Sequence, residues 1–166
     1  MAQMGTKTIL IDSDLRRPVL HSIFNLQRTP GLTNYLAGNV PWKEIVQETP
    51  IENLSLLTCG VLPPNPSELL GSKKMRMLLE ELKEKYDMIL FDSPPVIAVT
   101  DAAVLSTLLD GVVLVSSSGS TSREALQRAI TLLENVKGRL IGGVARAPRG
   151  RAAVPRAGRA GSAASR

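Results

Sequence analysis

The chain has 166 residues, of which 43% are hydrophobic and 21% are charged, a composition typical of a globular domain. No apolar run approaches the roughly 18–20 residues that span a bilayer, and residues 1–7 lack the apolar core of a signal peptide. The single cysteine, Cys59, excludes an internal disulfide. We therefore predict a soluble cytoplasmic protein built around one domain.

The net charge of +5 is concentrated at the C-terminus. Residues 145–166 contain six arginines and no acidic residue, whereas residues 1–144 contain 14 basic and 15 acidic residues. The body, 1–144, therefore gives no basic signal for nucleic acid. Residues 145–166 show no apolar periodicity, so we predict a disordered Arg/Ala-rich tail. A reading-frame shift near Ala145 would produce this composition; a natural basic tail that binds an acidic surface or nucleic acid is the alternative.

Short apolar runs alternate with helical patterns along the body. The runs are continuous rather than alternating, which is typical of parallel strands with both sheet faces covered by helices. We also expect the last run to begin a buried strand that breaks at Val144. The five predicted strands are 8–11, 54–57, 88–91, 112–115 and 140–141.

Two amphipathic helices are predicted at 75–86 and 125–136, because apolar residues recur there at spacings of three and four. Thr121 and Glu124 have capping-box spacing at the start of the second helix. The alternation of strands and helices predicts an α/β fold with a doubly wound, mainly parallel sheet.

Further helix starts are predicted between these strands. The loop in 60–70 is rich in proline and precedes a helix that Asn65 or Ser67 would cap. This segment is either a structural turn and cap or part of a partner surface. Thr100 and Asp101 are expected to cap the helix before the strand at 112–115.

Carboxylates stand where two predicted strands end. Asp12 and Asp14 follow the first strand, and Asp92 follows the strand at 88–91. Ligands of parallel sheets bind beyond the carboxyl ends of the strands, and carboxylates there can hold Mg²⁺ or accept a proton. Arg16 can bind phosphate or offset the carboxylate charge. A solvated turn with local ion pairs is the alternative interpretation.

Three segments together resemble the bacterial tyrosine kinase family of capsule and exopolysaccharide biosynthesis. Residues 10–18, Leu-Ile-Asp-Ser-Asp-Leu-Arg-Arg-Pro, resemble the Walker A′ motif of that family, and residues 91–95, Phe-Asp-Ser-Pro-Pro, resemble its Walker B motif. Residues 65–70, Asn-Pro-Ser-Glu-Leu-Leu, resemble a further signature. The resemblance runs in order from about Gly5 to Val144.

The resemblance implies a P-loop NTPase-like domain that uses ATP and Mg²⁺ to phosphorylate tyrosine. It implies catalytic roles for Asp12 and Asp14, metal binding by Asp14 and Asp92, and cofactor binding by Arg16. It further implies a membrane-embedded polysaccharide co-polymerase as activating partner, homo-oligomers of the full-length protein, and a location at the inner face of the membrane.

Two features depart from the family pattern. No Gly-x-x-x-x-Gly-Lys-Ser/Thr motif precedes the Walker A′ segment, and no tyrosine follows Tyr86. Residues 2–5 are similar to the last turn of the helix that would follow a P-loop, ending at a glycine. We therefore expect an incomplete sheet without its N-terminal strand, with exposed apolar edges, and impaired activity of this chain alone. A non-catalytic interaction module of the co-polymerase and a partitioning-type switch ATPase are the alternatives.

Overall fold

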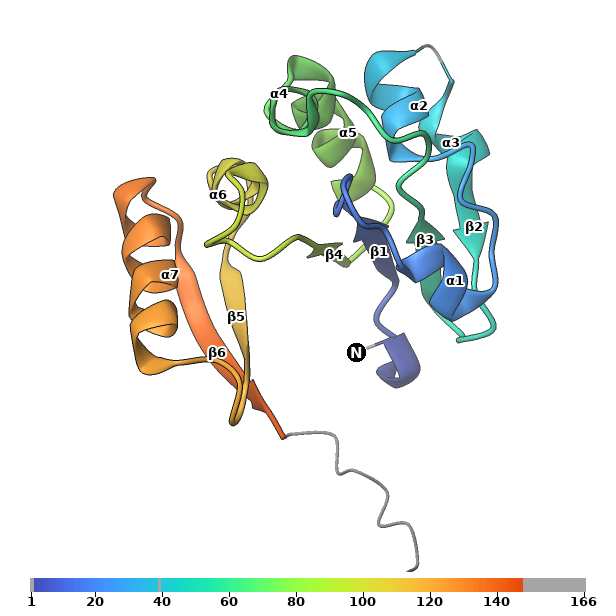
Figure 1. The fold of residues 1–166 in the computed structure, drawn as a ribbon. Helices are drawn as coiled ribbons and strands as arrows, with labels where there is room; N and C mark the ends of the chain where they lie inside the picture. Colours follow the sequence, from blue (N-terminus) through green and yellow to red (C-terminus); the bar gives the residue numbers. More distant parts are fainter. Residues whose placement is uncertain (1, 39, 148–166) are drawn as a thin grey trace, which may run out of the picture.

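The computed structural model describes residues 2–38 and 40–147 (Figure 1). Its elements, in chain order, are η1 (Ala2–Met4), β1 (Thr8–Asp12), α1 (Leu20–Phe24), α2 (Leu32–Ala37), α3 (Trp42–Ile45), β2 (Val46–Glu48), β3 (Leu54–Leu57), α4 (Pro66–Leu70), α5 (Lys73–Lys83), β4 (Met88–Asp92), α6 (Asp101–Ser106), β5 (Val112–Ser117), α7 (Arg123–Asn135) and β6 (Leu140–Arg146). Within this described part, no helix is both long enough and apolar enough to cross a membrane.

The strands form two separate sheets. The first has the order β2-β3-β1-β4, and the second pairs β5 with β6. The β1–β3, β1–β4 and β5–β6 pairs are parallel, whereas β2 joins β3 antiparallel. The predicted α/β class with a mainly parallel sheet is confirmed. The short antiparallel strand β2 was not among the predicted elements.

One face of the larger sheet carries the core. Ile9 and Ile11 of β1 are fully buried and belong to a cluster that includes Leu78 and Leu82 of α5. The α5 helix forms because its apolar residues recur on one face and because the Ser72 hydroxyl accepts a hydrogen bond from the Met75 amide, which caps its N-terminus. The helix predicted at 75–86 is thus confirmed, with its start at Lys73.

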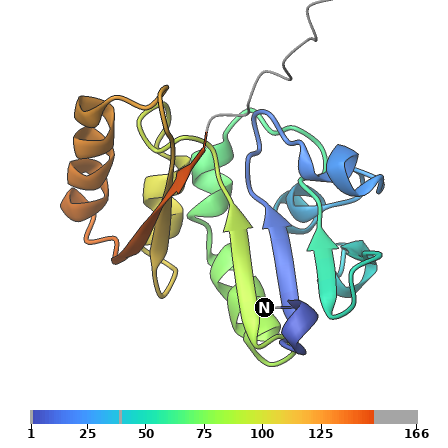
Figure 2. The ribbon, with the colours of Figure 1, turned by 90° about the horizontal axis from the view of Figure 1, so that it is seen from below.

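The opposite face of the same sheet loses its cover toward β4. Leu56, Leu10 and Leu90 are register partners across β3, β1 and β4. Leu56 is fully buried, Leu10 is half-buried and Leu90 is 41% exposed. Seen from below, no helix lies in front of β1 and β4 (Figure 2). The described residues therefore cover this face at β3 but leave it open at β4.

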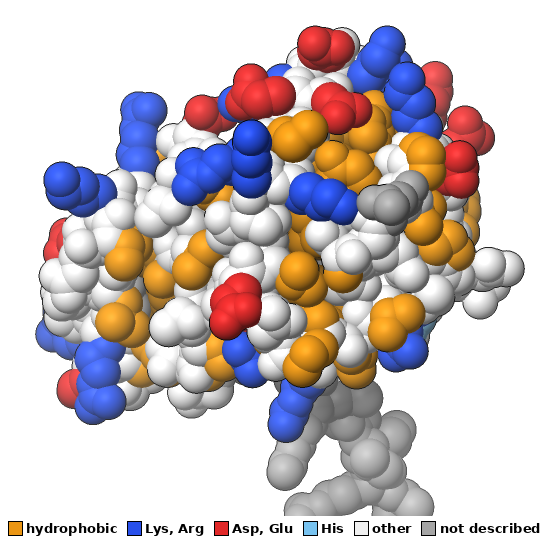
Figure 3. All heavy atoms as spheres, turned by 90° about the horizontal axis from the view of Figure 1, so that it is seen from above, with side chains coloured by type: hydrophobic (Ala, Val, Ile, Leu, Met, Phe, Trp, Pro, Cys, Tyr) orange, Lys and Arg blue, Asp and Glu red, His pale blue; other side chains and the backbone are white. Residues whose placement is uncertain are grey.

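The helix-covered side looks different. Seen from above, lysine, arginine, aspartate and glutamate side chains are spread between the apolar areas (Figure 3).

The smaller sheet lies beside β4 with α7 along it (Figure 1). Every residue of β6 is exposed, so the prediction of a buried final strand is wrong, because the described residues cover neither β6 face fully. The strand also continues past Val144 through Ala145 and Arg146. The remainder of the predicted tail, 148–166, lies outside the described residues.

The start of α7 corrects a predicted cap. The N-cap residue is Ser122, whose hydroxyl accepts a hydrogen bond from the Ala125 amide at 3.2 Å. Thr121 instead accepts from the Ser117 amide. The capping-box spacing of Thr121 and Glu124 therefore marked the helix start one residue too early.

The N-terminal turn has the predicted form. Residues 2–4 make one 3₁₀ turn, and the Gly5 amide donates to the Ala2 carbonyl at 2.9 Å. Gly5 has a φ of +89°, a conformation in which glycine has no steric penalty. It leads the chain directly into β1.

Candidate active site

Register places Asp12 beside Asp92 at the carboxyl ends of β1 and β4. Ser13 fastens this pair, because both its amide and its hydroxyl donate to the Asp92 carbonyl, at 2.9 and 2.6 Å. Ser13 is itself fully buried. The two strand ends therefore cannot slide past each other without breaking both bonds, and the pairing brings Asp12 and Asp92 to the same edge of the sheet.

Asp12 is a buried carboxylate with one unsatisfied oxygen. Its Oδ2 accepts a hydrogen bond from the Leu20 amide at 3.1 Å, at the first residue of α1. Its Oδ1 is buried, with no partner among the described residues. Burial raises the pKa of Asp12 to about 6, and the negative charges of Asp92 and Asp14 add to the shift. An unpaired buried oxygen is costly, and such groups are frequent at functional sites.

Asp14 and Asp92 complete the acidic group. Oδ1 of Asp14 accepts from the amides of Arg16 and Arg17 at 3.1 and 2.9 Å, which folds 14–17 into a tight turn after the strand. Partial loss of hydration raises the pKa of Asp92, and the charge of Asp14 raises it further. The three carboxylates thus act on one another electrostatically.

The donor set fits Mg²⁺ as a partly built site. In residues 2–38 and 40–147, no three His, Cys, Asp or Glu side chains are grouped closely enough to hold a metal ion. Mg²⁺, however, is usually bound by one or two carboxylates together with waters and substrate phosphates. The carboxylate oxygens of Asp14 and Asp92 are hard donors of this kind, and they lie beside the buried Oδ1 of Asp12, which has no partner among the described residues.

Arg16 forms an ion pair that the sequence did not predict. Its Nε and Nη2 donate to the two carboxylate oxygens of Asp101 at 2.8 and 3.3 Å. The Arg16 side chain is 43% exposed, whereas Asp101 is fully buried. Although burial acts to raise the pKa of Asp101, its bonds to Arg16 and Ser67 outweigh that effect and lower the pKa.

The helix starts around this pair differ from the predicted caps. Asp101 is the first residue of α6, after Thr100, and no side chain caps that helix. Ser67 donates to Asp101 rather than capping α4. Asn65 occupies the N-cap position of α4, but its side chain donates to Glu68. Asn65 and Thr100 thus occupy N-cap positions as predicted, but neither side chain makes a capping bond. Asn65 pairs with Glu68 instead, and the Ser67 hydroxyl bonds to Thr100 and Asp101.

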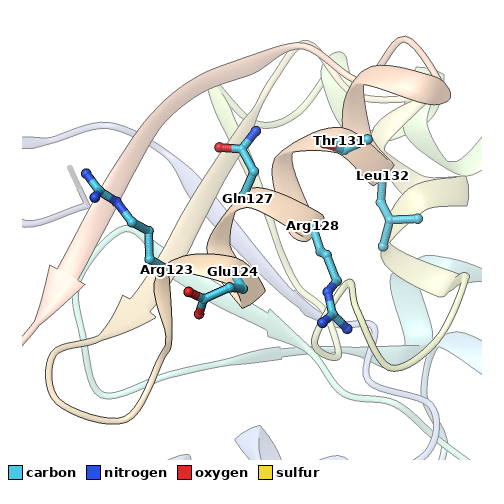
Figure 4. A pocket seen from close by; sticks show the side chains of 6 residues that line it. All are labelled: Arg123, Glu124, Gln127, Arg128, Thr131 and Leu132. Carbon is cyan, nitrogen blue, oxygen red and sulfur yellow. The ribbon is translucent and has the colours of Figure 1, made fainter.

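Two other features carry no chemistry of this kind. Burial raises the pKa of the Cys59 thiol to about 12, so the thiol stays protonated and unreactive. A second feature is an open hollow lined by six residues of α7, none of which is Asp12, Asp14 or Asp92 (Figure 4). Its lining residues are Arg123, Glu124, Gln127, Arg128, Thr131 and Leu132.

Comparison with known proteins gives the family. A family model described as an AAA domain matches residues 1–142. The tyrosine-protein kinase YwqD of Bacillus subtilis is 45% identical over 143 residues, which are 86% of this chain and 60% of that protein. This chain belongs to the bacterial tyrosine kinase family. It spans about three fifths of the length of that relative.

Solved structures agree with this assignment. The kinase domain of the Escherichia coli tyrosine kinase Etk is 33% identical, with a TM-score of 0.85 over 99% of this chain and 62% of that chain. MinD of Pyrococcus horikoshii, solved with Mg-ADP, is 22% identical, with a TM-score of 0.67 over 86% of this chain and 58% of that chain. The MinD likeness shows the shared P-loop ATPase-like fold.

Replacing Asp12 with asparagine should stabilise the fold at neutral pH. The native pKa of about 6 lies above the ordinary value of 3.8, so the unfolded chain ionises first as pH rises. The free energy of unfolding therefore falls as pH rises from about 4 to about 6 and stays low above that range. The total decrease is roughly 3 kcal/mol at most. Asp12→Asn keeps an acceptor for Leu20 and removes the charge, and we expect about 1–2 kcal/mol of gain at pH 8.

The measurement is chemical unfolding at pH 8 and at pH 4. The gain should shrink toward pH 4, where Asp12 is protonated in the folded state and close to half protonated in the unfolded chain, whose ordinary pKa is 3.8. Asp87→Asn is the control, because Asp87 is exposed at the other end of β4, and it should show no such pH dependence. A loss of stability in Asp12→Asn at pH 8 would contradict the unfavourable ionisation of Asp12.

Replacing Arg16 with alanine should lower the stability of the fold more than replacing Arg17 with alanine. Arg16→Ala leaves the buried Asp101 carboxylate without its cation, and we expect a clear loss of stability at pH 7. Arg17→Ala is the matched control, because the Arg17 side chain is exposed, and should change stability by less than about 0.5 kcal/mol. The pair stabilises the fold above the ordinary aspartate pKa, so the difference should fade in urea unfolding below about pH 4. Equal losses for both variants would show that the pair contributes nothing.

Proposed function

We propose that this chain is the core of an ATP-dependent protein tyrosine kinase that acts in capsular or exopolysaccharide biosynthesis. The observation that carries the proposal is the pairing of Asp12 with Asp92 at adjacent parallel strand ends, with one Asp12 oxygen buried and unpaired. The 45% identity to a tyrosine-protein kinase supports the same reaction. Phosphoryl transfer depends chiefly on positioning and on charge stabilisation, which fixed carboxylates at a rigid sheet edge provide.

Asp12 and Asp14 are proposed as the catalytic carboxylates. With a pKa of about 6, Asp12 is mostly ionised at pH 7 and yet more basic than an ordinary aspartate, so it can accept the proton of a tyrosine hydroxyl. Asp14 lies on the adjoining turn, fixed by the amides of Arg16 and Arg17. This turn keeps the second carboxylate at the same edge.

Asp14 and Asp92 are proposed to hold Mg²⁺, which when bound would neutralise phosphate charge. Arg16 is proposed to contact the nucleotide. Its bonds to Asp101 use Nε and Nη2, which leaves Nη1 to bind a phosphate oxygen. Because Asp101 fixes the guanidinium, little side-chain freedom would be lost when phosphate binds.

The sequence contains no Gly-x-x-x-x-Gly-Lys-Ser/Thr motif, so we propose that a separate segment supplies the backbone cradle for the nucleotide. Such a loop supplies the N–H groups and the lysine that hold the phosphates. We further propose a membrane-embedded polysaccharide co-polymerase as the activating partner. That partner would hold the kinase at the inner face of the membrane, and the full-length protein would form homo-oligomers.

A fusion protein that supplies a phosphate-binding loop and a tyrosine-rich tail should show the proposed tyrosine kinase activity. With a strand, a Gly-x-x-x-x-Gly-Lys-Thr loop and a helix from a family kinase ahead of Ala2, and a tyrosine-rich tail after Arg146, phosphotyrosine should form with ATP and Mg²⁺. Asp12→Asn and Asp14→Asn should each lower the rate by roughly 10²-fold or more, and Asp92→Asn should chiefly raise the Mg²⁺ requirement. Immunoblotting for phosphotyrosine over time measures the rates.

Asp87→Asn is the matched control, because Asp87 directly precedes β4 whereas Asp92 ends it. This variant should keep nearly the full rate. Loss of activity in this control equal to that in Asp12→Asn would contradict the proposed site. ATP hydrolysis without phosphotyrosine would favour a switch ATPase of the partitioning type instead.

A further inference from the structure

An exposed arginine is anchored beside the acidic edge of the larger sheet. Arg28 lies on the loop before α2, and its backbone carbonyl accepts hydrogen bonds from the Gly60 amide at 3.0 Å and the Thr58 hydroxyl at 2.9 Å. Thr58 directly follows β3, which runs parallel to β1. The backbone at Arg28 is therefore held at the same sheet edge as Asp12, one strand away from it.

The junction that holds this loop is closely packed. The amide of Leu32, the first residue of α2, donates to the Thr58 carbonyl at 2.8 Å. A Cβ atom on Gly31 would clash with that same carbonyl, so the close approach of the two backbones requires glycine. Thr58 is itself fully buried. The position of Arg28 is thus fixed by backbone contacts, and its side chain takes no part in them.

The Arg28 side chain lies close to the carboxylates. Arg28 is exposed, and within residues 2–38 and 40–147 it forms no ion pair. Its charge acts on the buried Cys59 thiol, as do the charges of two carboxylates. Burial and the charges of Asp12 and Asp14 raise the pKa of this thiol, whereas Arg28 lowers it. The guanidinium and the two carboxylates therefore lie around one buried thiol.

The two sides of the acidic edge differ in what they carry. β3 and β4 lie on opposite sides of β1 (Figure 1). Asp92 ends β4, and Asp101, which binds Arg16, begins the helix that follows β4. The proposed function places the metal ion and the nucleotide with these residues. A tyrosine hydroxyl that transfers its proton to Asp12 then approaches from the β3 side, where Arg28 lies.

The β3 side suits a peptide that contains tyrosine. Val61 and Leu62 are 54% and 46% exposed, and the Thr33 hydroxyl fixes the loop by donating to the Val61 carbonyl at 2.7 Å. Exposed apolar side chains offer contact area to an aromatic ring. In an extended peptide, residues up to two positions from the tyrosine lie within about 7 Å of its Cα atom. The long side chain of Arg28 can therefore reach a neighbour of the tyrosine.

We propose that Arg28 is a specificity-determining residue that binds an acidic side chain close to the acceptor tyrosine of the peptide substrate. The direction of approach rests on the proposed kinase function. A guanidinium binds a carboxylate through two parallel hydrogen bonds. The three carboxylates of the site repel acidic peptides, and Arg28 offsets this repulsion on the β3 side. An acidic neighbour of the tyrosine is thus favoured where it faces Arg28.

The test measures peptide binding to the full chain by NMR at low ionic strength. The peptides carry a central tyrosine with glutamate two positions away on each side, and matched peptides carry glutamine or lysine instead. We expect the glutamate peptide to bind about three- to fivefold more tightly than the glutamine peptide, the scale of an exposed ion pair. The Arg28 Nε–H signal should shift on binding. In 1 M salt, where the Debye length is about 3 Å, the preference should fade.

Charge reversal locates the contact. Arg28→Ala should abolish the preference for the glutamate peptide, and Arg28→Glu should make the lysine peptide the preferred one. Arg76→Glu is the matched control, because Arg76 is exposed on α5, and it should keep the wild-type preference. The dispersion of the amide spectrum checks that each variant is folded, which we expect because the anchoring contacts of residue 28 use only its backbone.

Three outcomes would overturn the proposal. They are the absence of saturable binding, equal binding of the glutamate and glutamine peptides, and a preference that Arg28→Glu retains. A preference that Arg17→Glu reverses while Arg28→Glu does not is a case of the third, and it would assign the contact to Arg17 on the turn after β1.

Failure of the proposed function gives a different result, because peptide binding requires no phosphoryl transfer. A fusion protein that forms no phosphotyrosine, while the chain keeps its peptide preference, would contradict the kinase function alone. An active fusion protein with equal KM values for the glutamate and glutamine peptides would contradict the role of Arg28 alone.

Discussion

The parallel pairing of β1 with β4 is the constraint on which the site depends. It runs in register from Thr8 with Met88 to Asp12 with Asp92, and Ser13 closes its end with two bonds to one carbonyl. Because side chains alternate in a strand, a slip of one residue would turn Asp12 into the core and Ile11 out of it. The apolar packing of Ile9 and Ile11 against α5 therefore also fixes where the carboxylates lie.

A second network fixes the segment that follows β1. Arg16 reaches from the turn after Asp14 to Asp101 at the start of α6, and Ser67 reaches the same carboxylate from α4. Three segments far apart in sequence thus meet on one buried charge. The turn that holds Asp14 is pinned at both ends, by the strand pairing and by this ion pair, so the acidic edge is organised before any ligand binds.

The sequence allowed the strand positions and the strand-end carboxylates to be predicted, because apolar runs that end in aspartate are local patterns. It did not allow the role of Asp101 to be predicted, since the Arg16 partner is 85 residues away and spacing says nothing about such a contact. Thr100 occupies the N-cap position of α6, but the expected side-chain capping bonds of Thr100 and Ser67 do not form, for the same reason. Their local pattern fits a cap, but a long-range ion pair offers the polar groups of this region better partners.

The solvent exposure of individual strands also could not be predicted from the sequence. The apolar runs of β4, β5 and β6 predict buried strands, yet Leu90, Val113 and Ile141 are exposed. A strand is buried only if neighbours cover it, and the pattern of one strand does not say whether its neighbours are among the same residues. The apolar composition of these strands is therefore typical of buried strands. The described residues cover them only in part.

The ionisation of Asp12 tests the central claim most directly. Following the side-chain carboxyl carbon of Asp12 by NMR while titrating the full chain yields its pKa in the folded state. A buried carboxylate with an unpaired oxygen beside Asp92 and Asp14 should titrate near the value of about 6. A pKa at or below the ordinary aspartate value of about 4 would contradict the account, because it would mean that Asp12 is hydrated or paired and not held at the strand end as a constrained carboxylate.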